Sequence, residues 1–270
     1  MGFTIGGSRG IRDIRSARPG SRRRGRAAER AVTAVAEYTG LWGWAVVPGA
    51  RSPSGASASP TASLASDTSA VSAVPAVSAV PSAAAAPGVS GACSCGRPGC
   101  ASPGAHPLSP AAEIPAGATL DEVGDAWARM PDATVLLPVG RAFDVLDVSA
   151  AAGRCALVRM ERMGLPLGPV TATPDGRCQF FVAPGAAAAL PELLYRMGWD
   201  DADLDLRCPA PGSFITAPPS DYAGLGPVIW LRPPSLDTAA APPEARLLLG
   251  TLAYICHRAV TRRSAGPAGE

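Results

Sequence analysis

Asp147 has the position expected of a metal ligand. It lies in a β-rich run over Ala142–Val148, and alternation along a strand puts Phe143 and Val145 on the same face as its carboxylate. Ser149 would follow on that face. A carboxylate at the end of an otherwise apolar strand offers the anionic oxygen that hard divalent cations require. Asp147 is therefore a candidate metal ligand.

The segment Asp203–Arg207 alternates more sharply. Asp203, Asp205 and Arg207 would share one face of a strand, with both leucines of the segment on the other face. Such a face could bind an ion or a phosphate, but the same alternation is typical of an ordinary half-exposed strand. From the pattern alone, the ordinary strand is the favoured interpretation.

Three cysteines and a histidine form a second candidate site. Cys93, Cys95, Cys100 and His106 fall within fourteen residues, separated by several glycines that would let a short loop wrap an ion. Tetrahedral zinc takes this set of sulfur and nitrogen ligands. The first pair is CxC, whereas common zinc motifs begin with CxxC. Two interpretations stay open, a structural zinc site and a metal-free loop of reduced thiols.

Charge is distributed unevenly along the 270 residues. All 24 cations are arginines, and residues 1–30 hold nine of them against Asp13 and Glu29, a balance of +7. Because the whole chain carries +2, the remaining residues sum to −5. This split excludes a uniformly basic nucleic-acid coat, so any electrostatic grip on phosphates must come from the tail or from a local patch. The repeated arginines of the tail fit contact with nucleic acid, and they equally fit a solvated terminus.

The cysteine count and the hydropathy indicate a cytoplasmic protein without a membrane segment. Seven cysteines are an odd number, which suits reduced thiols or metal ligands better than a disulfide framework. The most apolar stretch after the basic tail, Ala31–Val47, is interrupted by Glu37. No run approaches the roughly 20 apolar residues that a spanning helix needs.

Hydrophobic periodicity predicts the elements that must position these residues. Thr119 with Glu122 three residues later forms a capping-box pattern at the start of one helix. Gly140-Arg141 separates two β-rich runs and predicts a hairpin. Helices are predicted over Ala27–Tyr38, Thr119 to about Met130, Ala151–Met163, Ala187–Met197 and Pro243–Arg258, and strands over Trp44–Pro48, Ala133–Val139, Ala142–Val148, Gln179–Val182, Asp203–Arg207 and Ser213–Thr216. This mixture predicts an α+β domain around a largely antiparallel sheet.

Composition divides the chain into domain and non-domain segments. Residues 51–90 carry Arg51 and Asp67 as their only charges, lack aromatic residues and consist mostly of Ser, Ala, Pro and Val, so they cannot form a core. The predicted organisation is a disordered Arg-rich tail over 1–26, the first helix and strand of a domain over 27–50, a disordered linker over 51–90, the rest of the domain over 91–260 and a disordered tail over 261–270.

Several segments, taken in order, resemble the bifunctional DNA primase/polymerase (Prim-Pol) domain of the archaeo-eukaryotic primase superfamily. The similar segments are the WGWAVVP step at 42–48, the cysteine loop at 93–107, the WARMP helix end at 127–131, DVLDVS at 144–149, TPDGRCQFF at 173–181, DLR at 205–207 and the APPS turn at 217–220. The resemblance implies a primase-like fold with the linker as an insertion. It also implies catalytic aspartates that bind Mg²⁺ or Mn²⁺ at Asp147 and Asp205, and nucleotide contacts from Arg207 and Ser220.

The chain departs from the family pattern at three positions. The first motif of the family is an Asp-x-Asp pair, and here it reads Asp147 and Ser149. Gln179 stands where the second motif carries a histidine, and Ala105 replaces the lysine of the cysteine loop. Serine is a weaker cation ligand than a carboxylate, and glutamine cannot act as a general acid. These losses predict weakened catalysis or none.

Three hypotheses from different classes follow. The favoured one is a catalytically weakened or inactive primase/polymerase-like protein that binds a nucleoside triphosphate or nucleic acid. The second is an active template-dependent primase or DNA polymerase, a nucleotidyltransferase that would need a separate helicase to open duplex DNA. The third is an interaction module whose zinc loop and arginine tail contact partners.

Overall fold

The structure, a computed structural model, describes residues 19–51, 93–97, 100, 104–108 and 113–264. Residues 1–18 of the predicted arginine tail, all of the predicted linker except Arg51, and the chain after residue 264 lie outside the described residues. The first helix begins at Pro19 and not at Ala27, so part of the segment expected to be a tail belongs to a helix.

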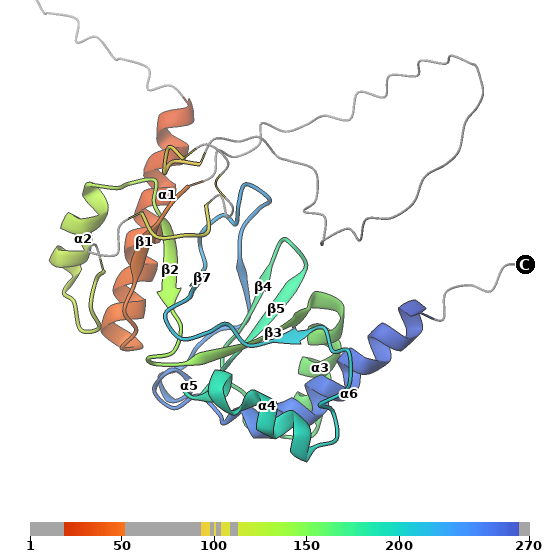
Figure 1. Ribbon diagram of the computed structural model, residues 1–270. Coiled ribbons are helices and arrows are strands. Elements are labelled where there is room, and N and C mark those ends of the chain that lie inside the picture. The colour runs from red at the N-terminus through yellow and green to blue at the C-terminus, as the bar shows by residue number, and fades with distance from the viewer. Residues whose placement is uncertain (1–18, 52–92, 98–99, 101–103, 109–112, 265–270) are drawn as a thin grey trace, which may run out of the picture.

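Eight strands form two antiparallel sheets (Figure 1). The smaller sheet has the order β1-β2-β7, and the larger has the order β6-β3-β5-β4-β8. The strands are β1 Val47–Gly49, β2 Thr134–Pro138, β3 Asp144–Ser149, β4 Val170–Thr173, β5 Arg177–Val182, β6 Leu206–Arg207, β7 Phe214–Thr216 and β8 Ile229–Arg232. The α+β class and the antiparallel sheet are confirmed.

Helices cover both sheets. The π-helix η1 continues α1 directly, and α1 and α2 lie beside the smaller sheet, whereas α3, α4 and α6 lie with the larger one (Figure 1). The helices are α1 Pro19–Ala36, η1 Glu37–Leu41, α2 Leu120–Ala128, α3 Ala150–Arg162, α4 Ala186–Arg196, α5 Leu236–Ala240 and α6 Ala245–Ser264. The capping box of Thr119 and Glu122 at the start of α2 is confirmed.

The predicted hairpin around Gly140-Arg141 is wrong. β2 pairs with β1 and β7, whereas β3 pairs with β5 and β6, so the chain crosses from one sheet to the other between them. The turn itself is tight, since the Gly140 N–H donates to the Phe143 carbonyl at 2.9 Å. Val139 and Phe143, on either side of this turn, both bury in the core between the sheets, and that burial decides the path of the chain.

The strand β3, between β6 and β5, separates two cores. Phe143, just before the strand, and Val145 pack into a cluster with Trp44 and Phe181, between the sheets. Leu146 and Val148 pack into a second cluster with the apolar faces of α3 and α6. Because side chains alternate along a strand, Asp147 lies on the face of Phe143 and Val145, opposite α3 and α6.

Within the described part of the chain, none of the helices has the length and apolar character needed to cross a membrane.

Candidate functional site

Asp147 is at the centre of the predicted carboxylate site. Its strand β3 is flanked by β5 and β6, and the register pairs Asp147 with Gln179 on one side and with Arg207 on the other. Directly paired residues of antiparallel strands present their side chains on the same face. The sheet therefore brings together three residues that are distant in sequence.

Arg177 joins the two predicted catalytic aspartates. Its Nε lies 2.6 Å from Oδ1 of Asp147, and its Nη1 lies 2.6 Å from Oδ1 of Asp205. The side chains of Arg177 and Asp147 are only 13% and 8% exposed, while that of Asp205 is 32% exposed. Burial lowers the pKa of Arg177, but hydrogen bonds and the charges of Asp205 and Asp147 outweigh it and raise the pKa. The guanidinium is held in its charged form between two carboxylates.

Gln179 is fixed by two hydrogen bonds. Its Nε2 donates to Oδ2 of Asp147 at 3.3 Å, and its Oε1 accepts from the Thr171 hydroxyl at 3.0 Å. Gln179 is buried, so this amide acts through Asp147 and Thr171. It supplies hydrogen bonds but neither a positive charge nor an acidic proton.

Ser149 ends β3 and directly precedes α3. It pairs with Arg177 in the β3–β5 register, and its side chain makes no capping hydrogen bond to the helix. A serine beside Arg177 leaves room for the guanidinium to reach Asp147. The position that would carry the second aspartate of the first motif therefore faces an arginine.

The two residues expected to bind nucleotide differ in their surroundings. Arg207 is 65% exposed and its Nε lies 3.3 Å from Oδ1 of Asp147, so most of its guanidinium is open to a ligand. Ser220 follows the cis Pro218-Pro219 bond, is buried, and its hydroxyl accepts the N–H of Val135 on β2 at 2.7 Å. The geometry ties Ser220 to the smaller sheet through that bond.

The sequence reasoning missed Arg177 and Tyr222. Burial and the charges of Asp175 and Asp147 raise the pKa of Tyr222. The phenol of Tyr222 is therefore near these two carboxylates. Arg177 could have been found, because it sits two residues before Gln179 and strand alternation puts both on the face of Asp147. Tyr222 lies in a turn after β7 and gives no periodic signal.

The carboxylate site does not fit a two-metal centre. Mg²⁺ or Mn²⁺ would need the oxygens of Asp147 and Asp205, and both carboxylates are engaged by Arg177. With Arg177 and Arg207 against these two carboxylates, the four formal charges cancel. A divalent cation would meet a guanidinium where it requires anionic oxygen.

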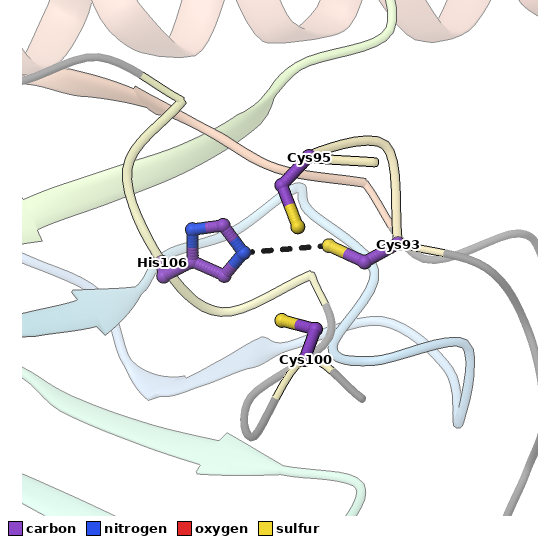
Figure 2. A group of neighbouring side chains, drawn as sticks. All are labelled: Cys93, Cys95, Cys100 and His106. Atoms are coloured by element: carbon purple, nitrogen blue, oxygen red, sulfur yellow. Dashed lines mark hydrogen bonds between the residues drawn. The ribbon is translucent and has the colours of Figure 1, made fainter. Parts of the chain in front are cut away.

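The cysteine cluster converges as the spacing predicted. Figure 2 shows the side chains of Cys93, Cys95, Cys100 and His106 grouped around one point, and their ligand atoms all lie within 4.8 Å of one another. Sγ of Cys93 lies 3.4 Å from Nε2 of His106. The other ring nitrogen of His106, Nδ1, is 2.9 Å from the Pro107 carbonyl, the kind of contact that orients a histidine toward a metal.

Backbone donors favour the thiolate form of Cys93. Burial raises the pKa of Cys93, but hydrogen bonds from the N–H groups of Cys95 and Gly104, and contacts with the Cys95 and His106 side chains, lower it to about 6. Thiolates are the form in which cysteines bind zinc. The donor set, its spread and the protonation state are all compatible with a zinc ion.

The cysteine loop is attached to the smaller sheet. The N–H of Ala50 donates to the His106 carbonyl at 2.8 Å, and the N–H of Ser94 donates to the Arg51 carbonyl at 2.9 Å. The Thr134 hydroxyl donates to the Ala50 carbonyl at 3.0 Å. The loop thus extends the end of β1, away from the β3–β5–β6 ladder that holds Asp147.

The larger antiparallel sheet carries Asp147 on β3, with Asp205 just before β6, and the smaller sheet carries the cysteine loop, an arrangement compatible with the primase-like fold that the resemblance implies. Comparison with protein families agrees, because residues 35–245 match "Bifunctional DNA primase/polymerase, N-terminal", the Prim-Pol family. The match covers more than half of the chain, and the chain belongs to this family. Comparisons with curated proteins and with solved structures gave no match.

Family membership confirms the resemblance and supports a primase/polymerase-like function. Prim-Pol proteins act on nucleotides and DNA and depend in general on metal ions. The arrangement of Arg177 bears directly on how much of that activity this chain keeps.

Proposed function

We propose that this protein is a Prim-Pol member that has lost nucleotidyl transfer and binds nucleoside triphosphate or nucleic acid. One observation carries the proposal: the Arg177 guanidinium bridges Asp147 and Asp205 at 2.6 Å each. Those are the two carboxylates that would have to hold the catalytic cations.

Nucleotidyl transfer by this class of enzyme is an in-line attack of a hydroxyl on the α-phosphate of a triphosphate. Two divalent ions about 3.5–4 Å apart usually stabilise the charge on the attacking and leaving oxygens. Here Ser149 replaces one carboxylate, and Arg177 and Arg207 together neutralise the two that remain. Gln179 cannot donate a proton as a histidine would. The residues present do not supply the charge that this chemistry needs.

The same residues favour phosphate binding. Arg207 is largely exposed beside Asp147, and its guanidinium offers paired N–H donors that match phosphate oxygens. Arg177 is engaged by Asp147 and Asp205, so the exposed donors of Arg207 would make the phosphate contact. A triphosphate bound here would interact with an arginine where an active family member would use metal ions. The Ser220 hydroxyl accepts the Val135 N–H and keeps its own O–H as a donor for a phosphate oxygen.

Zinc is proposed for the cysteine loop. Cys93, Cys95, Cys100 and His106 would hold the ion and join the loop ends to the end of β1. A zinc ion here stabilises the fold and provides no catalysis, since all four ligands come from the protein. The interaction-module hypothesis would need a partner that binds this loop.

An active primase is the alternative function. It would need a separate helicase, and the family match does not support a helicase partner. Primer extension with Mg²⁺ and Mn²⁺, together with calorimetric titration of a nucleoside triphosphate, tests both hypotheses. We expect binding without extension. Extension that disappears in Asp147→Ala would overturn the proposal, and so would a failure to bind both triphosphate and single-stranded DNA.

A further inference from the structure

A groove lined by arginines runs between α3 and α6. It has a volume of about 960 Å³, and its described lining contains five arginines and no carboxylate. The arginines are Arg154, Arg159 and Arg162 from α3, and Arg258 and Arg262 from α6. All five are exposed. The uneven charge along the sequence allowed phosphate contact only from the tail or from a local basic patch. This groove is such a patch.

These arginine charges are not neutralised within the described part of the chain. No carboxylate there forms an ion pair with any of the five. The nearest acidic residue in sequence, Glu161, points instead to Arg232 of β8 at 3.9 Å. Five like charges around one hollow repel each other, and an anionic ligand would relieve that repulsion.

Tyr254 orders two of the arginines. The guanidinium carbons of Arg159 and Arg258 each lie 5.7 Å from the centre of its ring, and Nη1 of Arg258 lies 3.3 Å from its hydroxyl oxygen. Cation–π contacts of this kind hold flexible arginines in place. When the arginine side chains are already ordered in the free protein, they lose less conformational entropy on binding a ligand.

The groove also carries exposed apolar surface. Val158 of α3 and Met163 just after it are 46% and 48% exposed, and Tyr254 is 41% exposed. Apolar surface beside planar guanidinium groups suits the flat faces of nucleic-acid bases, which stack on aromatic rings and on arginine. An acidic peptide would use the charges but would leave this apolar surface without a matching partner.

The groove is distinct from the carboxylate site. Asp147 lies on the face of β3 that packs between the sheets, whereas α3 and α6 cover the other face through Leu146 and Val148. The helix α6 begins at Ala245, where the segment matched to the Prim-Pol family ends. Five of the thirteen residues that line the groove therefore come from the part of α6 that the family match does not include.

We propose that the α3–α6 groove binds single-stranded nucleic acid, with the arginines on the phosphates and the Tyr254 cluster against the bases. From Arg154 to Arg162 the helix rises about 12 Å, long enough for a few successive nucleotides. This site goes beyond the proposed triphosphate site, and it does not require Asp147, Arg177 or Arg207.

The test is fluorescence anisotropy of a labelled oligothymidylate of about 12 nucleotides, a length within the site sizes of single-strand binding proteins. Arg159→Gln/Arg258→Gln should weaken binding about tenfold or more, because two charge-assisted contacts are lost. The log–log salt slope should fall by about 1.4, since each phosphate contact on a single strand contributes about 0.7. A double variant of equal charge change, Arg129→Gln just after α2 with Arg196→Gln on α4, should bind like the wild type.

Tyr254 separates a role in nucleic-acid binding from charge alone. Tyr254→Phe keeps the ring and should bind within about twofold of wild type, whereas Tyr254→Ala should lose about tenfold. A polyglutamate of similar length should compete poorly. Equal competition by polyglutamate, or unchanged oligonucleotide affinity in the Arg159/Arg258 variant, would overturn the proposal.

A second readout separates this proposal from the proposed function. Binding of a nucleoside triphosphate, measured by calorimetry, should be the same in Arg159→Gln/Arg258→Gln and in the wild type. Loss of oligonucleotide binding with triphosphate binding intact supports two sites. If both are lost together while the protein stays folded by circular dichroism, the groove is not a separate site.

Discussion

Ser149 and Arg177 are paired residues at the end of the β3–β5 ladder, and Arg177 reaches from that position to both Asp147 and Asp205. The pairing connects one departure from the Prim-Pol pattern, Ser149, with an arginine of the second motif. An aspartate at position 149 would place a third carboxylate next to the guanidinium. With serine there, the arginine meets two carboxylates and supplies the positive charge that metal ions would otherwise provide.

Arg177 should contribute more to stability than Arg207, although both contact Asp147. Arg177→Ala leaves a nearly buried carboxylate without its main partner, which costs about 1–3 kcal/mol in the free energy of unfolding. Arg207→Ala removes an ion pair whose arginine is largely exposed, and it should cost less than about 1 kcal/mol. Urea denaturation of both variants measures the difference. Equal losses would contradict the central role of Arg177.

Replacing Ser149 with aspartate and Arg177 with alanine should allow the site to bind a divalent cation. In Ser149→Asp/Arg177→Ala, three carboxylates would surround a position with no guanidinium, and Mn²⁺ should raise the melting temperature. Saturation at 100 times the dissociation constant corresponds to about 2.7 kcal/mol. The wild type and Arg177→Ala alone are the controls and should respond less. An Mn²⁺ response of the same size in the wild type would show that Arg177 does not exclude the ion.

Arg207 should be the main contact for triphosphate. Arg207→Ala should weaken triphosphate binding about tenfold, because a charge-assisted hydrogen bond is lost. Arg207→Lys keeps the charge but not the paired donors, and it should recover only part of the affinity. Calorimetric titration gives both values. Unchanged affinity in Arg207→Ala would place the ligand elsewhere.

Metal analysis should find one zinc ion per chain. Cys95→Ser and His106→Ala should each lose the ion and lower the melting temperature, since the loop is hydrogen-bonded to the end of β1. The control is Cys155→Ser, an exposed cysteine on α3 outside the cluster, which should keep the zinc. A protein purified without zinc that neither takes it up nor changes its melting temperature on adding it would contradict the assignment.

Gly153 is required for the close packing of α3 on the larger sheet. An added Cβ would lie 2.4 Å from Cβ of Cys178 and 3.2 Å from Cγ2 of Val148, so the helix would have to shift. We expect Gly153→Ala to cost about 1–3 kcal/mol in the free energy of unfolding. Gly124→Ala on α2 meets nothing within 4 Å and should stabilise by about 0.5–1 kcal/mol. Thermal denaturation should move the two melting temperatures in opposite directions.

Local signals predicted individual elements well. The capping box at Thr119 set the start of α2, and the apolar periodicity of the Ala151–Met163 segment gave α3 within one residue at each end. The strands β4 and β8 were missed because each has only four residues, a run so short that periodicity marks it weakly. The expected hairpin failed because burial of Val139 and Phe143 between two sheets outweighed the turn signal at Gly140.

Sequence patterns named most residues of the candidate site, but they did not predict how the charges of these residues are paired. Asp147, Gln179 and Arg207 come together as the family resemblance implied, because they pair across β5, β3 and β6. Arg177 was visible in the second motif but received no role. Its reach to Asp205 depends on the fold, since Asp205 lies just before β6, on the far side of β3.

By itself, the sequence determined the residue types. It showed an incomplete set of the carboxylates of the family motifs and a cluster of four candidate zinc ligands. It also showed that residues 31–270 are acidic in sum, so that phosphate binding by this part needs a local basic patch. These follow from composition, spacing and family pattern, which are properties of neighbours along the chain. Only the tertiary structure decided that Arg177 lies between Asp147 and Asp205, and that arginines of α3 and α6 line one groove. Both depend on contacts between strands and helices far apart in sequence, which side-chain burial in the two cores fixes.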